Sequence, residues 1–461
     1  MPGTGTDVHV ARGEDGTIRV ATGPVLGHAR AYDDVVAAGP DFTRSVLDVA
    51  GAVLVWPVLG DPGLPVAEVH DVRRAQQWLW AVYGENVAAA VHACAAGTGA
   101  GAGAGAAEPV RVRVAAELTA LAGGAARLGF GHWASRWWPA SYTDGIPVLE
   151  PDVLGLELAA LTHRCQQLFD DFGDQPDDCV AELIAEHEAA LDPLIQWWRA
   201  APRPADTARH LENILRLIDD AADGAGLDGR ALRRLRSALD PDTDVDMNLD
   251  VDLDLDLDLG QRRTAGAPVD PGALFARQGG YALAAGEPLV AGGRVIARGS
   301  GLNDWRRCPP GLVDAAEDSV SWTARALGGR RQIEVEVVAH AAAPAAGVPL
   351  VAEVQVNGGR PHRVPLARRD DVWTGRADLD LNPDPPELSA ATSPCVEVGV
   401  LLPGFDPGAG PDGRADRDAI RALARRRLTG AAGPLPSDAY DTFSGPFLAE
   451  TLTATATSED Y

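Results

Sequence analysis

The sequence contains no lysine, so arginine supplies all 40 of its permanently cationic side chains. Schiff-base formation, the anchoring of pyridoxal phosphate, the phosphate-binding P-loop and the phosphate contact of protein kinases each need a lysine amine. The chain therefore cannot carry out these four chemistries. The accompanying excess of alanine, glycine, proline, aspartate and arginine indicates a high-GC genome, which concerns codon usage and says nothing about function.

Cysteine is also scarce, and the chain has no CxxC pair. The five cysteines are Cys94, Cys165, Cys179, Cys308 and Cys395. An odd, scattered set predicts buried free thiols in a reducing compartment instead of disulfides or a zinc site. Residues Met1 to Asp15 lack the apolar segment of a signal peptide, and the longest apolar run, Val49 to Leu59, is about half a membrane span. We therefore expect a cytoplasmic protein with no membrane insertion.

Positive charge is in short supply, because 40 basic residues face 66 Asp and Glu and the net charge is −26. Nine aspartates between Asp240 and Asp258 account for nine of these excess charges, so the acidity is spread over the whole chain. A nucleic-acid-binding protein needs a positive surface that displaces counterions from phosphates. We expect no nucleic-acid partner and no binding to anionic membranes.

The hydrophobic period changes from helical to strand-like along the chain, which predicts an α+β multidomain protein. In order, we predict a mixed α/β segment packed on the bundle (residues 1–95), a flexible Gly/Ala loop (96–109), a bundle-like helical region (110–239), an acidic low-complexity linker (240–270), an antiparallel β-sandwich with one following helix (271–429) and a flexible C-terminal tail (430–461).

Helical periodicity is strongest in two stripes of apolar residues that recur at steps of three and four. The stripes are Leu154, Leu158, Leu161, Cys165, Leu168 and Phe172, then Val180, Ile184, His187, Leu191, Leu194 and Trp198. Pro193 is expected to kink or split the second helix. Another helix is predicted from Asp71, and Asp206 and Asp228 are predicted N-caps. The apolar stretch Val110–Trp138 is predicted to be the central helix.

Strand-like alternation dominates the second half. Residues 333–337 and 351–356 each alternate apolar and polar side chains, and the second run ends at Asn357-Gly358, a dipeptide typical of tight hairpin turns. Six or seven short strands at this spacing favour an immunoglobulin- or C2-like sandwich. In the first half, Asp41–Pro57 predicts one or two buried strands.

The repeat between Asp240 and Asp258 places an aspartate at every second position except Asn248. In an extended chain, successive carboxylates on one face lie about 6.6 Å apart. Calcium needs six to eight oxygens at about 2.4 Å, and the repeat has no glycine that would bend it around an ion. We interpret the repeat as a solvated spacer, with weak binding of cations as the alternative.

The segment Gly129–Pro139 is the most distinctive local feature, because tryptophans and an arginine lie close together on a predicted helix. Trp and Arg anchor many protein interfaces through large rigid area and planar stacking. The same residue types also fill cores where helices meet, and core packing is the favoured interpretation. The alternatives are an interaction surface that includes Trp133, Arg136, Trp137 and Trp138, together with Trp305, and, for His132, a catalytic role.

Other candidate groups favour structural roles. His163 is predicted to be solvated and His187 to be a satisfied core histidine, and no set of three or four metal ligands can be assembled. The segment Asn303–Asp318 is interpreted as a structural connector. The alternatives are an interaction loop and a nucleophilic Cys308 paired with His340 or His362, which nearby carboxylates would disfavour by raising the thiol pKa.

Taken together, these patterns favour a non-catalytic intracellular protein-interaction or scaffold protein that needs no cofactor and binds another protein. The first alternative is a hydrolase or transferase that uses carboxylates and histidine. The second is a module that binds a metal or a small ligand. An enzyme would require several ionisable groups that converge in one pocket.

Overall fold

The computed structural model describes residues 5–22, 40–60, 63–97, 109–115, 117–169, 176–200, 204–240, 274–275, 294–327, 330–340, 343, 347–379, 395–404, 413–433 and 445–458. Within these ranges the chain combines helices with antiparallel sheets, which confirms the α+β prediction. None of the described helices is long and apolar enough to cross a bilayer. Each of the five cysteines has a free thiol. The predicted cation-binding repeat lies outside these ranges beyond Asp240, so that idea stays a prediction.

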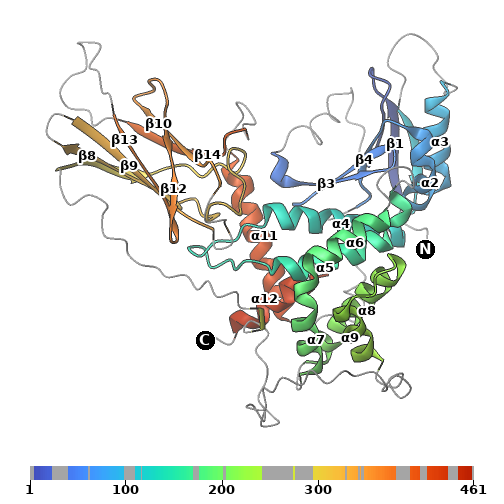
Figure 1. Ribbon diagram of the computed structural model, residues 1–461. Helices are drawn as coiled ribbons and strands as arrows, with labels where there is room; N and C mark the ends of the chain where they lie inside the picture. The colour runs from blue at the N-terminus through green and yellow to red at the C-terminus, as the bar shows by residue number, and fades with distance from the viewer. Residues whose placement is uncertain are drawn as a thin grey trace, which may run out of the picture.

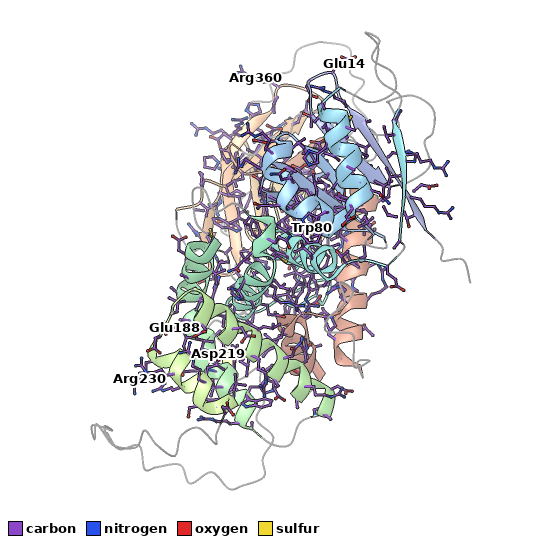
Figure 2. The ribbon with its side chains drawn as sticks, turned by 90° about the vertical axis from the view of Figure 1, so that its right-hand side faces the viewer. Glu14, Trp80, Glu188, Asp219, Arg230 and Arg360 are labelled. Atoms are coloured by element: carbon purple, nitrogen blue, oxygen red, sulfur yellow. The ribbon has the colours of Figure 1, made fainter. Side chains whose placement is uncertain are left out.

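A six-stranded antiparallel sheet forms the N-terminal part, with strand order β3-β4-β5-β2-β1-β6. Its strands are β1 (Thr6–Arg12), β2 (Ile18–Thr22), β3 (Arg44–Val49), β4 (Ala52–Pro57), β5 (Val66–Val69) and β6 (Val110–Val114). The buried side chains of the sheet pack against α2 (Val72–Tyr83), α3 (Glu85–Ala95) and α4 (Ala120–Trp137). Figure 2 shows α2 and α3 in front of the sheet, with Trp80 exposed on α2.

Two predictions for this part are confirmed and one is wrong. Asp71 is the N-cap of α2, because its side chain accepts hydrogen bonds from two backbone N–H groups of the first turn. The segment Asp41–Pro57 forms two strands, β3 and β4. The predicted central helix Val110–Trp138 is wrong, because its first residues pair with β1 as strand β6 and helix α4 begins at Ala120. The predicted start of the helical region at residue 110 would assign β6 to that region, although β6 belongs to the N-terminal sheet.

Helix α5 (Pro151–Arg164) lies at the centre of the helical region, since every residue from Val153 to Thr162 is buried. It packs against α4, α6 (Pro176–His187) and α8 (Ala205–Gly224). Helices α7 (Leu191–Arg199) and α9 (Arg230–Leu239) pack against each other and against α8. The chain leaves the α-helix before Pro193, as predicted. The predicted caps Asp206 and Asp228 are displaced, because Pro204 and Gly229 occupy the N-cap positions and make no side-chain cap.

The C-terminal strands form a five-stranded sheet of order β12-β13-β9-β8-β7 and a three-stranded sheet of order β11-β10-β14. Their bounds are β7 (Arg294–Ser300), β8 (Val320–Leu327), β9 (Arg330–Val338), β10 (Val351–Val356), β11 (His362–Pro365), β12 (Ala367–Arg369), β13 (Val372–Asp378) and β14 (Val396–Leu401). Buried side chains from both sheets, such as Val335 and Val354, meet in one core cluster. Asn357 and Gly358 have φ angles of 52° and 69° between β10 and β11, which confirms the hairpin turn.

Two helices follow the strands, α11 (Arg414–Ala432) and α12 (Leu448–Ser458). Figure 1 shows them in red at the centre of the molecule, between the C-terminal sheets and helices α4 and α5. Phe447, Leu448 and Leu452 are buried in the same core cluster as the N-terminal sheet and helices. The prediction of a flexible tail from residue 430 is therefore wrong for α12, and the predicted single helix after the strands is wrong as well. These last residues complete the core of the first half.

Candidate interaction cleft

A cleft of about 400 Å³ opens between strand β3 and the C-terminal half of α4, and we call it the β3–α4 cleft. Asp41, Arg44 and Val46 line it from the strand side. His132, Trp133, Arg136 and Trp137 line it from the helix side. Four ionisable side chains and two tryptophans therefore share one solvent-open hollow.

Helical spacing explains the helix side of the cleft. The four lining residues of α4 fall at steps of one and three, which places them along one side of the helix. The helix lies close to the sheet at Gly129, where a Cβ atom would lie only 3.3 Å from the ring of Trp56 on β4. After Trp138 the chain turns away at Pro139, a residue that a helix interior does not tolerate. The cleft therefore sits where α4 ends against the sheet.

The floor of the cleft is aromatic and firmly held. Trp133 and Trp137 are 3% and 5% exposed. The indole N–H of Trp133 donates to the backbone oxygen of Phe42 over 2.7 Å. The Phe42 ring packs against Trp137 with ring centroids 6.0 Å apart. These tryptophans present only a small part of their surface to the cleft and belong mainly to the core.

The rim of the cleft carries the charge and one exposed apolar side chain. Arg44 pairs with Asp41 over 2.8 Å. The guanidinium of Arg136 lies over the Trp137 ring, 5.2 Å from its centroid, and its side chain is exposed. Val46 is 51% exposed, which is unusual for a valine at the middle of a strand. Planar guanidinium groups above an apolar floor suit a ligand that carries both carboxylates and apolar groups.

His132 is the one titratable base of the cleft. Desolvation by the surrounding protein lowers its pKa, although the ring stays in contact with solvent at the mouth. A neutral imidazole can act as a general base only next to a group that it deprotonates. The described lining contains no serine, threonine, cysteine or tyrosine. The predicted catalytic alternative for His132 thus has no protein nucleophile to activate.

Two of the five predicted surface residues lie elsewhere. Trp305 is 0% exposed, and its ring packs edge-on against Phe42 at 5.3 Å. Trp138 is 7% exposed and donates its indole N–H to the oxygen of Pro147. The prediction that Trp138 and Trp305 belong to an exposed surface is wrong, because both rings are buried in the core near the end of α4. Trp133, Arg136 and Trp137 do reach the cleft, and their binding role stays a prediction.

A second concentration of ionisable groups lies inside the core. We call it the Arg–acid cluster; it consists of Arg127, Glu157, His210, Arg427 and Glu450. Arg427 makes a bidentate pair with Glu450 over 2.6 and 2.7 Å. Arg127 donates to two carbonyl oxygens just before α12 and lies 3.8 Å from Glu157. The same arginines also lie over the rings of Phe130 and Phe447.

Burial sets the protonation states within the Arg–acid cluster. It raises the pKa of Glu157 to about 7, although the positive charge of Arg127 opposes the rise. It lowers the pKa of His210 to about 3, and Arg127 adds to this effect. Glu157 and Glu450 accept the backbone N–H groups of Ala449 and Phe447 at the start of α12. The cluster therefore anchors α12 and is closed to solvent, since its two acids and His210 are at most 1% exposed.

The segment Asn303–Asp318 acts as a connector, as predicted. Arg417 of α11 is fully buried, and its guanidinium donates to the two carboxylate oxygens of Glu317 over 2.7 and 3.0 Å. Burial alone would raise the pKa of Glu317, but the hydrogen bonds from Arg417 and Arg421 lower it. Burial raises the pKa of Cys308 to about 12, so its thiol stays protonated. The nucleophile alternative for Cys308 is wrong for this reason.

The other histidines give no metal site. No group of three or more His, Cys, Asp or Glu side chains in the described part of the chain is placed to hold a metal ion. His187 lies 3.0 Å from Asp152 and packs directly on Gly155 of α5, which agrees with a satisfied core histidine. His163 is half-buried and bonds Gln166 over 3.0 Å, so the prediction of a solvated side chain is wrong.

The chain was compared with protein-family models, curated proteins and solved structures, and none of these comparisons gave a match.

Sequence reasoning missed the strand side of this cleft. Asp41, Arg44 and Val46 lie about 90 residues before the lining residues of α4, and only the packing of β3 on that helix brings them near. One signal was present in the sequence. Residues 45, 47 and 49 are the buried positions of β3, so the alternation leaves Val46 as an apolar side chain on the opposite face.

Proposed function

We propose that this chain is a non-catalytic protein-interaction protein that binds a partner protein in the β3–α4 cleft. The observation that carries this proposal is the combination of an aromatic floor, the exposed Val46 and the guanidinium groups of Arg44 and Arg136 in one open hollow. Interface hot spots commonly combine tryptophan and arginine within such a setting. The floor is already held by core contacts, so a partner would meet a preorganised site.

The placement of the other ionisable groups supports a binding role over catalysis. The groups with the most strongly shifted pKa values, Glu157 and His210, are sealed inside the Arg–acid cluster. The open cleft holds a histidine without a protein nucleophile beside it. An active site needs shifted groups and substrate access in the same place. In the described part of this chain, the most strongly shifted pKa values lie in the buried Arg–acid cluster, whereas solvent access lies at the β3–α4 cleft.

The finer architecture and location belong to the same proposal. Helices α4 to α9 would act as a bundle that presents the cleft, the two C-terminal sheets would act as a sandwich, and the protein would work in the cytoplasm. The shared core cluster of the two sheets supports the sandwich. The free cysteines support a reducing compartment.

A pull-down from the native host tests the proposal. The bait pair is the unmodified chain and the double variant Val46→Asp/Arg136→Glu, which changes two exposed rim residues and spares the buried tryptophans. The matched control is Val110→Asp/Arg113→Glu, which makes the same chemical changes on exposed residues of β6 at the far edge of the same sheet.

We expect mass spectrometry to find a partner that the unmodified chain and the β6 control retain and the cleft variant loses. Circular dichroism must show that all three baits are folded. The proposal fails if the three folded baits capture the same proteins in the same amounts.

A further inference from the structure

The described residues from 5 to 240 and those from 274 to 458 share one buried core, and we call these segments the first part and the second part. The largest core cluster draws side chains from both of them. Either part alone would expose its share of this core to water. The second part contributes Trp305 and Ala315 from the segment before β8, Ile420 and Ala424 from α11, and Phe447, Leu448, Ala449 and Leu452 at α12.

Helix α12 and the residues just before it bind the first part through buried polar groups. The guanidinium of Arg127 donates to the backbone oxygens of Gly445 and Pro446 over 3.2 and 2.9 Å. The backbone N–H of Ala449 donates to the carboxylate of Glu157 over 3.1 Å. Arg127 and Glu157, which belong to the first part, are 5% and 1% exposed. Charge-assisted hydrogen bonds of this kind give the contact strength and also fix its register.

A second contact joins the turn before α5 to two separate segments of the second part. The backbone N–H of Tyr142 donates to the carboxylate of the buried Asp314 over 2.7 Å. The guanidinium of Arg421 lies 3.4 Å from Asp144 of the first part and 3.1 Å from Glu317 of the second. Helix α11 therefore joins a carboxylate of each part at the position where Figure 1 shows it, between the C-terminal sheets and α4.

The two C-terminal sheets enclose a core of their own. Its buried members all lie between Cys308 and Val400, within the second part. The contacts that join the two parts all lie outside residues 241–273. The surface between the parts therefore has the composition of a protein–protein interface, with a buried apolar centre and desolvated polar pairs, and the peptide connection is an addition to it.

A covalent connection helps two parts to associate by raising their effective concentration to about the millimolar range. It is indispensable only if the affinity of the interface itself is weaker than that. Interfaces of standard size with well-packed aromatic anchors reach roughly micromolar dissociation constants or tighter without a connection. The shared core and the buried Arg127 and Glu157 contacts place this interface in that class.

We propose that the two parts stay assembled without the peptide connection between them, so that a chain cut between residues 240 and 274 remains one folded protein. The surface of the first part that α11, α12 and the segment before β8 cover is then a binding surface for a separate polypeptide, the second part. The inference is independent of the proposed function, because the β3–α4 cleft lies within the first part. Cleavage of the connection would leave the C-terminal sheets attached to the part that carries the cleft.

The test uses the full chain with the recognition sequence of a site-specific protease inserted between Gly260 and Gln261. The folded protein is cut under native conditions and applied to a size-exclusion column at about 10 µM, tenfold above a micromolar dissociation constant. We expect the two fragments to elute together at the volume of the uncut chain, with an unchanged circular dichroism spectrum. Separate elution of the fragments, or precipitation after the cut, overturns the inference.

A matched pair of variants tests which core joins the two parts. Leu448→Ala truncates a 0% exposed side chain of the shared cluster, and Leu350→Ala truncates a 1% exposed side chain in the cluster of the two C-terminal sheets. Each variant is cut after folding, and the dissociation constant of its fragments is measured by dilution. We expect Leu448→Ala to weaken association by about thirtyfold or more, the low end for a buried Leu→Ala change.

Leu350→Ala should change the dissociation constant by less than about threefold, because its side chain lies away from the shared core. Equal weakening by the two variants, or none by Leu448→Ala, would show that the shared core does not join the parts and would overturn the inference. Cutting the unmodified chain still decides the inference if either variant fails to fold.

Discussion

Helix α4 carries two arginines in opposite circumstances. Arg127 is 5% exposed and donates to the chain just before α12, whereas Arg136, nine residues later, is exposed over the Trp137 ring at the rim of the cleft. Both lie beside aromatic side chains. The difference comes from the segment just before α12, because the backbone oxygens of Gly445 and Pro446 accept from Arg127, whereas Arg136 lies at the rim of the cleft.

The two arginines of α4 are therefore expected to have different roles, Arg127 in stability and Arg136 in recognition. A buried arginine whose partner acid is also buried stabilises the fold only as long as both are present. An exposed arginine over a ring contributes little to folding. Substitutions in the Arg–acid cluster should therefore change unfolding, and substitutions at the cleft rim should change binding.

The largest expected effect comes from breaking a buried pair. Arg427→Met leaves the fully buried Glu450 without its bidentate partner, and we expect a loss of about 3–5 kcal/mol in the free energy of unfolding. Urea unfolding measures it. The matched control is Arg234→Met, which breaks the exposed bidentate pair with Asp192 and should cost under about 1 kcal/mol. Equal losses for the two variants would contradict a special role of burial.

The next effect is a pair of opposite pH slopes. Between pH 4.5 and 7 the folded chain holds a proton on Glu157 that the unfolded chain releases, so stability falls as pH rises. Between pH 6.5 and 3, His210 is protonated in the unfolded chain but stays neutral in the folded chain. The free energy of unfolding therefore falls as pH falls through this interval. The two contributions oppose each other from pH 4.5 to 6.5.

Single substitutions should reveal each slope. Glu157→Gln leaves the His210 contribution, and the variant should lose up to about 3 kcal/mol between pH 6.5 and 4.5. His210→Asn leaves the Glu157 contribution, and that variant should gain stability over the same interval. Urea unfolding at pH 4.5 and 6.5 gives both values, with the unmodified chain as reference. Parallel slopes for the two variants would show that these groups are not shifted in opposite directions.

A smaller effect separates two helical glycines. Gly155→Ala would place a Cβ atom 1.9 Å from the ring of His187, so the ring must move away from Asp152, and we expect a loss of about 1–3 kcal/mol. Gly123→Ala on α4 meets no atom within 4 Å and should stabilise by about 0.5–1 kcal/mol, because glycine is costly inside a helix. Thermal unfolding monitored by circular dichroism compares the two directly, and a gain for Gly155→Ala would contradict the packing described.

The smallest expected change in stability is at the cleft rim. Arg136→Gln removes an exposed charge and should alter the free energy of unfolding by less than about 0.5 kcal/mol. The same variant should weaken capture of the partner protein that we propose for the β3–α4 cleft. A loss of several kcal/mol in urea unfolding would place Arg136 with Arg127 as a structural arginine and remove the contrast between the two halves of α4.

Much of the fold could be predicted from local patterns. The helix that carries Leu154, Leu158 and Leu161, the helix that begins after Asp71 and the turn at Asn357-Gly358 each depend on residues a few positions apart, and each agrees with the structure. The predicted stripe on α5 extends too far, because α5 ends at Arg164, and its last residue, Phe172, lies outside the described residues. Helix α12 escaped prediction because four of its eleven residues are threonines, which are weak helix formers. Its helix depends on tertiary contacts with the Arg–acid cluster, which local patterns do not show.

The helix side of the β3–α4 cleft could be predicted from the sequence, but the strand side could not. Trp133, Arg136 and Trp137 stand out by residue type and helical spacing. The strand side required knowing that β3 lies at the edge of the sheet and against α4. Trp138 and Trp305 share the residue type of the true lining but are buried, because composition cannot distinguish a tryptophan that fills a core from one that faces solvent.

The late position of α12 affects how the protein is made. A ribosome releases residues 5–240 long before Phe447 and Leu448 emerge, at about 5–20 residues per second. During that interval the nascent first half holds the charged side chains of Arg127 and Glu157 without the N–H and C=O groups that later satisfy them. Its final compaction must wait until residues 445–458 have emerged, and until then the chain presents an incomplete core to chaperones.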